Sequence, residues 1–212
     1  MDKYVLVLAG GKEVSKKTLM NYAEKAELVI GVDKGAETAF KHNVKVDLLI
    51  GDFDSIDKKL LSSNSIKKIK YPVEKEKTDL ELALDYISER NYENVLILSA
   101  LGNRIDHTLG NIFLLERYKF RDIKIIDDIS EIFILDEKDL ILKNKKGFLL
   151  SIIPVSRKIE IEKIEGVKYS LGNRIVERSS TLCISNLINK EICCMSIKTG
   201  KAFIVITKNM EE

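Results

Sequence analysis

The stretch that decides the fold is Val46-Asp47-Leu48-Leu49-Ile50-Gly51-Asp52-Phe53-Asp54-Ser55, an apolar run that ends in two acids. Such a run predicts a buried strand. Residues two apart in an extended chain point to the same face, so we expect Asp52 and Asp54 to converge, about 7 Å apart. Carboxylates held that close favour a cation between them, and Mg²⁺ takes oxygen ligands and brings phosphate with it. The alternative is a turn in which these residues cap the next helix.

Four further apolar runs share the character of this strand. They are short, nearly continuous and rich in Val, Ile and Leu, as is typical of strands covered on both faces. They span residues 4–8, 28–32, 95–98 and 123–126. Amphipathic helical patterns alternate with them, for example over 80–87 and 109–116. This alternation predicts a mostly parallel α/β/α sheet domain over residues 1–128.

The pattern changes after residue 128. Short strand-like segments follow one another over 132–135, 139–142, 148–153, 159–161, 192–197 and 202–207. Turn-prone glycines fall between many of them, at Gly147, Gly166, Gly172 and Gly200. No long helical pattern interrupts the series. Residues 129–212 are therefore predicted to form a small all-β sandwich.

Composition and charge argue against several classes of protein. The 212 residues include 35 basic and 33 acidic side chains, and the resulting net charge of +2 argues against nucleic acid as a partner. Cys183, Cys193 and Cys194 are odd in number and lack metal-ligand spacing, so neither a disulfide framework nor a zinc site is expected. No apolar stretch approaches the ~20 residues that span a bilayer, and the start lacks a signal-peptide layout. We therefore expect a cytoplasmic protein with no membrane segment.

Polar residues follow the ends of several predicted strands. Asp33 follows the run 28–32, Asp52 and Asp54 follow the opening strand, and the segment 102–106 follows the run 95–98. Open parallel sheets bind ligands at the carboxyl ends of their strands. This common location favours a metal–phosphate role for Asp52 and Asp54 over simple capping.

Two helix starts carry further candidates. Thr78-Asp79-Leu80-Glu81 reads as a capping box, with Asp79 either serving the helix dipole or binding metal. In the segment 102–107, Arg104 offers a planar fork for phosphate oxygens. Asp106 would orient Arg104, cap the helix or bind metal, and His107 near a helix start is more often structural than catalytic.

Together and in order, these segments resemble the thiamine pyrophosphokinase family. The resemblance covers nearly the whole chain and includes the second half, where Tyr169 stands within Gly166-Val167-Lys168-Tyr169-Ser170-Leu171. The other motifs are Val32-Asp33-Lys34-Gly35-Ala36, Gly51-Asp52-Phe53-Asp54-Ser55, Lys77-Thr78-Asp79-Leu80-Glu81-Leu82-Ala83-Leu84, Gly102-Asn103-Arg104-Ile105-Asp106-His107 with Asn111, and Ile184-Ser185-Asn186.

The resemblance implies transfer of the pyrophosphoryl group of ATP to the hydroxyl of thiamine, with AMP as the second product. It implies a homodimer whose active site joins one chain's α/β domain to the other's β domain. Asp79, Arg104 and Asp106 would serve catalysis, with Asp79 our choice of general base and Asp54 and Asp106 left open. The implied ligand sets are Asp33, Asp52, Asp54 and Asp79 for Mg²⁺; Asp33, Ser55, Thr78, Arg104, His107 and Asn111 for ATP; and Tyr169, Ser185 and Asn186 for thiamine.

The chain departs from the family pattern at several positions. In the second half, Tyr169 stands where the family commonly has Trp and Leu187 where it has Glu, and both changes bear on vitamin recognition. In the catalytic half, Lys34 and the run Glu74-Lys75-Glu76-Lys77 depart from the family motifs. Tyr169 would otherwise pack as a strand residue, and Ser185 with Asn186 would otherwise form a turn. The alternative functions are a pyrophosphokinase for a hydroxymethylpterin or similar heterocyclic alcohol, and a non-catalytic nucleotide or vitamin sensor.

Overall fold

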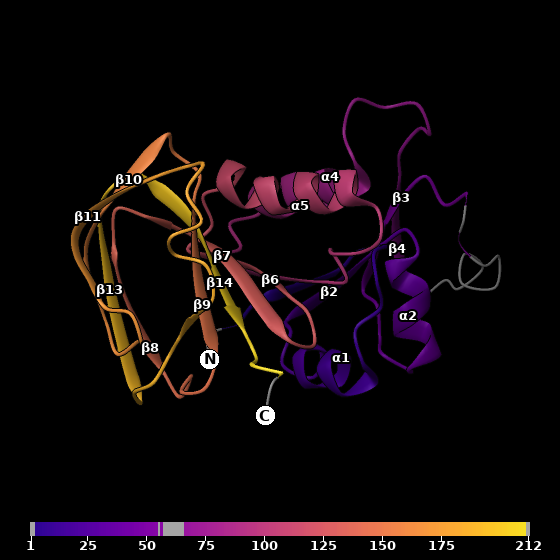
Figure 1. Ribbon diagram of the computed structural model, residues 1–212. Coiled ribbons are helices and arrows are strands. Elements are labelled where there is room, and N and C mark those ends of the chain that lie inside the picture. Colours follow the sequence, from indigo (N-terminus) through magenta and orange to yellow (C-terminus); the bar gives the residue numbers. More distant parts are fainter. Residues whose placement is uncertain (1–2, 55, 57–65, 211–212) are drawn as a thin grey trace. The chain divides into compact units, whose positions relative to one another are not determined.

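The computed structural model describes residues 3–54, 56 and 66–210, and the chain divides into two compact units, 1–128 and 129–212 (Figure 1). Each unit has its own cluster of buried apolar side chains. The first unit combines helices with a parallel sheet, and the second consists of antiparallel sheets. The mixed α/β fold predicted from the sequence is confirmed.

The first unit contains a sheet in which every pair of neighbouring strands is parallel. The order is β4-β3-β2-β1-β5-β6. The five predicted apolar runs all form strands, whereas β4 has a polar sequence at the sheet edge and was not predicted. The bounds are β1 (Val5–Leu8), β2 (Leu28–Val32), β3 (Leu48–Gly51), β4 (Lys67–Lys70), β5 (Asn94–Leu98) and β6 (Asp122–Ile126).

Four described helices cover both faces of this sheet: α1 (Lys16–Ala23), α2 (Gly35–Lys41), α4 (Asp79–Ser88) and α5 (Ile105–Arg117). Figure 1 shows α1 and α2 on one face and α4 and α5 on the other. Right-handed crossovers require this, because the chain crosses the sheet in one direction from β1 to β3 and in the other from β4 to β6. In the described part of the chain, none of the helices combines the length and apolarity that a membrane crossing needs.

Glycines allow the strand ends to approach one another closely. A Cβ on Gly35, the first residue of α2, would lie 1.9 Å from the Leu8 carbonyl oxygen at the end of β1. A Cβ on Gly11 would lie 2.5 Å from the Ser99 oxygen, to which the Gly11 N–H donates a 2.7 Å hydrogen bond. Backbone contacts therefore fix the carboxyl ends of β1 and β5.

The second unit contains two antiparallel sheets whose apolar faces share one core. The core includes Cys183 and Cys193, and all three cysteines are free. The strand orders are β12-β9-β14-β7 and β11-β10-β13-β8. The bounds are β7 (Ser130–Asp136), β8 (Asp139–Lys143), β9 (Leu149–Pro154), β10 (Lys158–Glu165), β11 (Leu171–Glu177), β12 (Asn186–Leu187), β13 (Ile192–Thr199) and β14 (Lys201–Thr207).

The glycine contacts predict opposite effects for two Gly→Ala changes in helices. Gly35→Ala should lower the free energy of unfolding by about 2 kcal/mol or more, because the new methyl would press on the Leu8 carbonyl. Gly110→Ala in α5 should raise it by roughly 0.5–1 kcal/mol, since nothing lies within 4 Å of its Cβ and alanine favours helix. Urea titrations of both variants measure the difference, and equal midpoints would contradict the packing described.

Candidate active site

Three acids from separate elements meet at the carboxyl edge of the first unit's sheet. Asp33 follows β2, Asp52 follows β3, and Asp79 is the first residue of α4. Lys75 joins them: its Nζ lies 2.7 Å from Asp79 Oδ1 and 3.6 Å from Asp52 Oδ2. The Lys75, Asp79 and Asp52 side chains are only 13%, 13% and 14% exposed. The structure thus brings together three of the four predicted metal acids around a buried ammonium.

The position of Asp33 depends on Gly51. Asp33 has a left-handed φ of 47°, and its carboxylate passes over Gly51, where a Cβ would lie 2.1 Å from Asp33 Oδ1. This Oδ1 is buried and receives no hydrogen bond from the described residues. A buried oxygen without a donor costs free energy, which a bound cation would recover. The oxygen-rich donor set therefore fits a hard divalent cation.

The acids differ in how the surroundings shift their pKa values. Burial, and then the charge and hydrogen-bonding proximity of Asp79, raise the pKa of Asp33 to about 7. The backbone N–H of Asp54, which donates to Asp52 Oδ1 at 3.0 Å, lowers the pKa of Asp52. Burial lowers the pKa of Lys75, but the contact with Asp79 and the charges of Asp52 and Asp33 together outweigh burial, and the net shift is upward. The ammonium therefore stays charged among the acids at neutral pH.

The extended geometry predicted for Asp52 and Asp54 is wrong. Strand β3 ends at Gly51, and Phe53 has a left-handed φ of 66°, so the two acids do not lie on one face of a strand. Asp52 instead accepts the Asp54 N–H, as in the turn considered from sequence, and Asp54 is exposed. Ser55, predicted to contact ATP, lies outside the described residues. A metal role for Asp54 stays a prediction.

A cavity of about 290 Å³ lies between the starts of α4 and α5. Four residues predicted to serve nucleotide binding or catalysis line it, together with apolar and acidic neighbours. The free N–H groups at the two helix starts favour anions, whereas the two carboxylates in the lining oppose them unless a cation is bound. The lining consists of Thr78, Glu81, Asp106, His107, Gly110, Asn111 and Leu114.

Two of these lining residues have defined structural tasks. Thr78 caps α4 by accepting the Glu81 N–H at 3.3 Å, as predicted. The reciprocal hydrogen bond of a capping box, from the Thr78 N–H to the Glu81 carboxylate, is not among the contacts of the described residues. Glu81 Oε1 instead lies 3.3 Å from Arg117 Nη1. Asn111 donates its amide to the Ala100 carbonyl at 2.7 Å, which ties α5 to the end of β5.

Arg104 and Asp106 form a two-pronged ion pair at the start of α5. Arg104 Nε donates to Asp106 Oδ1 at 3.0 Å and Nη2 to Oδ2 at 2.5 Å. Arg104 is 72% exposed, and its hydrogen bonds hold the pKa of Asp106 far below its usual range. Of the three roles left open for Asp106, the structure shows the orienting one. A carboxylate with so low a pKa is a weak proton acceptor.

In the second unit, the side-chain amide of Asn186 makes two hydrogen bonds to the backbone of Tyr169. Its Oδ1 accepts the Tyr169 N–H at 3.0 Å, and its Nδ2 donates to the Tyr169 carbonyl at 2.8 Å. Tyr169 is 64% exposed, and Lys168 Nζ lies 5.4 Å from the centroid of its ring. Ser185 is exposed with a φ of 57° and donates its N–H to Ser151 Oγ. Tyr169 is therefore presented to solvent instead of packing in the core.

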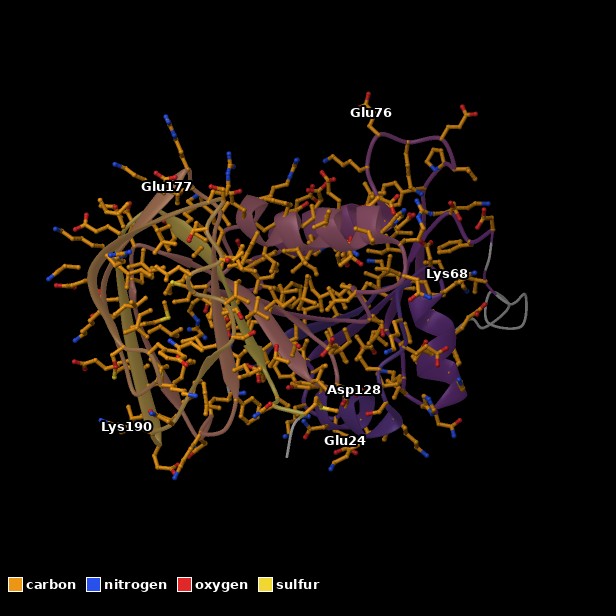
Figure 2. All side chains as sticks on the ribbon, in the orientation of Figure 1. Glu24, Lys68, Glu76, Asp128, Glu177 and Lys190 are labelled. Carbon is orange, nitrogen blue, oxygen red and sulfur yellow. The ribbon has the colours of Figure 1, made fainter. Side chains whose placement is uncertain are left out.

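Sequence reasoning missed Lys75, which has the same residue type as many surface lysines. The run Glu74-Lys75-Glu76-Lys77 alternates, and Figure 2 shows Glu76 projecting outward from the loop before α4. Glu74 and Glu76 are exposed whereas Lys75 points inward. Among the residues that the structure describes, no three acids, histidines or cysteines form a ready metal-binding group, and Lys75 stands between two of the acids.

Comparisons with known proteins agree along the whole chain. Family models described as "Thiamin pyrophosphokinase, catalytic domain" and "Thiamin pyrophosphokinase, vitamin B1 binding domain" match residues 19–126 and 138–204. Thiamine pyrophosphokinase of Bacillus subtilis (strain 168) is 36% identical over 191 residues, 87% of this chain and 89% of that protein. A crystal structure of thiamine pyrophosphokinase from Bacillus subtilis has a TM-score of 0.87 and 30% identity, covering 99% of this chain and 100% of that one. One from Geobacillus thermodenitrificans has a TM-score of 0.84 and 27% identity, covering 100% and 99%.

The raised pKa of Asp33 predicts a pH-dependent stability in metal-free buffer. Between pH ~4 and ~7 the unfolded chain releases the Asp33 proton while the folded chain retains it, so this group's contribution to stability is lost as pH rises. The free energy of unfolding of Asp33→Asn should therefore rise relative to that of the wild type as the pH increases across that window, by about 1–2 kcal/mol after allowance for solvent screening.

Urea unfolding at several pH values in EDTA measures this gain. Asn tolerates the left-handed backbone at position 33, so the substitution tests charge more than shape. Glu24→Gln, which removes an exposed acid at the end of α1, is the control (Figure 2). A difference between Asp33→Asn and the wild type that does not change with pH would contradict the assignment.

Proposed function

We propose that this chain, which belongs to the thiamine pyrophosphokinase family, uses residues 1–128 to bind ATP with Mg²⁺ and residues 129–212 to hold thiamine. The family reaction transfers the pyrophosphoryl group of ATP to thiamine. One observation carries the proposal: a buried carboxylate cluster at the ends of β2 and β3 and the start of α4, in which Asp33 Oδ1 and Asp79 Oδ1 receive no hydrogen bond from the described residues and Asp79 Oδ1 contacts the Lys75 ammonium. The chain's membership of this family gives no support to the two alternative functions, a pterin pyrophosphokinase and a non-catalytic sensor.

The acidic cluster is proposed as the magnesium site, with ligands Asp33, Asp52, Asp54 and Asp79. Carboxylates alone would repel a triphosphate, and a divalent cation reverses the sign of the local charge and stabilises the phosphoryl oxygens. The chain's own contribution is to hold the acids in place: Gly51 leaves room for Asp33, and the Asp54 N–H orients Asp52.

The nucleotide is proposed to lie against the starts of α4 and α5. Thr78, His107 and Asn111 stand at the cavity there, and Ser55 completes the predicted set from outside the described residues. Arg104, held as a planar fork by Asp106, offers its guanidinium to the phosphates. Positioning and charge stabilisation supply most of the catalysis in such transfers.

The transfer itself forms one P–O bond and breaks another. The thiamine hydroxyl oxygen attacks the β-phosphorus, and the bond from that phosphorus to the α–β bridging oxygen breaks, so that AMP leaves with the electron pair. A carboxylate accepts the hydroxyl proton. We propose Asp79 for this role, with Asp54 and Asp106 as the alternatives; the ion pair with Arg104 disfavours Asp106.

Thiamine is proposed to contact the exposed ring of Tyr169. A cationic thiazolium is attracted to an aromatic face by roughly 0.5–2 kcal/mol and would have to displace the Lys168 ammonium from the ring or use its other face. Ser185 is proposed to hydrogen-bond the aminopyrimidine, and Asn186 to contribute through its hold on the Tyr169 backbone.

A homodimer and a cytoplasmic location complete the proposal. Ile105, Leu109 and Phe113 lie four residues apart along α5 and are 73%, 51% and 53% exposed, as an interface between copies would use. Three free cysteines suit a reducing compartment.

Removal of a single metal acid is predicted to abolish turnover. With ATP, Mg²⁺ and thiamine, Asp52→Asn and Asp79→Asn should form AMP at least about 100-fold more slowly than the wild type, because each removes a charged ligand of the cation that stabilises the phosphoryl oxygens. Mass spectrometry of the products gives the rates, and circular dichroism checks the fold. Glu24→Gln controls for loss of an acid elsewhere. Wild-type rates in both Asp variants would refute the metal assignment.

The Tyr169 proposal predicts an effect confined to the vitamin. Tyr169→Leu should raise KM for thiamine by about 2- to 30-fold, the equivalent of 0.5–2 kcal/mol, while leaving KM for ATP unchanged. Tyr169→Trp should retain or improve KM for thiamine, because tryptophan has the better face for a cation. Steady-state kinetics with each substrate varied in turn measure both constants. An unchanged KM for thiamine in Tyr169→Leu would place the vitamin elsewhere.

A further inference from the structure

Lys75 occupies a position unlike that of its sequence neighbours. Its ammonium lies between Asp79 Oδ1 at 2.7 Å and Asp52 Oδ2 at 3.6 Å, and its side chain is 13% exposed. Lys77, two residues on, is 40% exposed and pairs with Asp85, at the same distance of 2.7 Å but outside the cluster. The loop before α4 therefore directs one lysine into the acids and leaves the next at the surface.

The acids and Lys75 depend on one another electrostatically. Three clustered carboxylates repel each other, and the Coulomb attraction of a buried ammonium offsets that repulsion. Lysine in turn loses its hydration when buried and is stable there only when paired. The charges of Asp79, Asp52 and Asp33 all act on Lys75 in the direction that favours its charged form.

Close contact and charge together hold the ammonium in place. Lys75 Nζ is buried and lies 2.7 Å from Asp79 Oδ1, and the charges of Asp52 and Asp33 add to the attraction of Asp79. Asp33 Oδ1, another atom of the same cluster, is also buried without a hydrogen-bond donor. An ammonium that contacts one side of the cluster leaves Asp33 Oδ1 unsatisfied, and a hard divalent cation, which takes several oxygen ligands, can replace it.

We propose that Lys75 is a built-in counter-cation that holds the carboxylates together in the metal-free protein and is displaced by the divalent cation when it binds. The inference rests on the proposed magnesium site and adds a competitor to it. Lys75 is thus a positioning residue that sets how tightly the cluster takes up metal. Removal of the Lys75 ammonium should lower the stability of the metal-free protein and should raise the affinity of the cluster for metal.

Metal binding without nucleotide tests the inference. Titration of the full chain with Mn²⁺, followed by electron paramagnetic resonance of the free ion, gives Kd for the wild type, Lys75→Met and the matched control Lys77→Met. Lys75→Met should bind Mn²⁺ on the order of tenfold more tightly than the wild type, because no ammonium competes for the acids. Lys77→Met should bind like the wild type. Equal or weaker binding by Lys75→Met overturns the inference.

Thermal unfolding provides a second readout. In EDTA, Lys75→Met should melt below the wild type, and saturating Mg²⁺ should raise its Tm by more than it raises the wild-type Tm. If Lys75→Met does not fold in EDTA, Lys75→Gln, which keeps a polar group of similar reach, is titrated instead, with the same expected tightening. A smaller rise than in the wild type overturns the inference.

Asp52→Asn separates failure of this inference from failure of the proposed function. If the wild type binds Mn²⁺ and Asp52→Asn binds it much more weakly, the metal site stands, and the Lys75 variants alone decide the inference. If the wild type and Asp52→Asn bind Mn²⁺ equally, the metal lies elsewhere and both proposals fall.

Discussion

Repulsion among Asp33, Asp52 and Asp79 is the constraint around which the carboxyl edge of the first unit's sheet is arranged. Buried like charges are costly unless a cation compensates them, and Lys75 supplies one in the protein alone. The surrounding backbone is shaped to the same end: Gly51 has no side chain where Asp33 must pass, and Asp33 accepts a left-handed conformation. Sites that store such strain and charge are stable only when packing elsewhere fixes the backbone, as the contacts of Gly11 and Gly35 do here.

The sequence predicted the buried parts of the fold well and the edges poorly. Every apolar run became a strand, because strands covered on both faces must be apolar throughout. The strands it missed, β4, β11 and β12, all lie at sheet edges, where one side of the strand has no neighbour and polar residues such as Lys67 and Asn173 are tolerated. Hydrophobic periodicity carries no signal for such strands.

The candidate site shows the same division. Strand ends located Asp33 and Asp52, and the capping pattern located Asp79, because these follow from topology and local hydrogen bonding. The turn at Phe53 and the inward direction of Lys75 depend on backbone angles and on charge from distant residues, which no local pattern encodes. The departures from the family pattern at Lys34, Glu74 and Glu76 fall at exposed positions, so they leave the cluster itself intact.

The two hydrogen bonds between Asn186 and the Tyr169 backbone make the path of the main chain at position 169 independent of the side chain there. The amide fixes where the main chain at position 169 runs, whatever ring that residue carries. The aromatic group can therefore change over evolutionary time, from indole to phenol or back, without redirecting the chain that presents it. Position 186 tolerates less change. Aspartate would lack the N–H donor to the Tyr169 carbonyl, and leucine would make neither hydrogen bond and would leave the Tyr169 peptide groups buried without partners. Among relatives, the residue type should vary more at position 169 than at position 186.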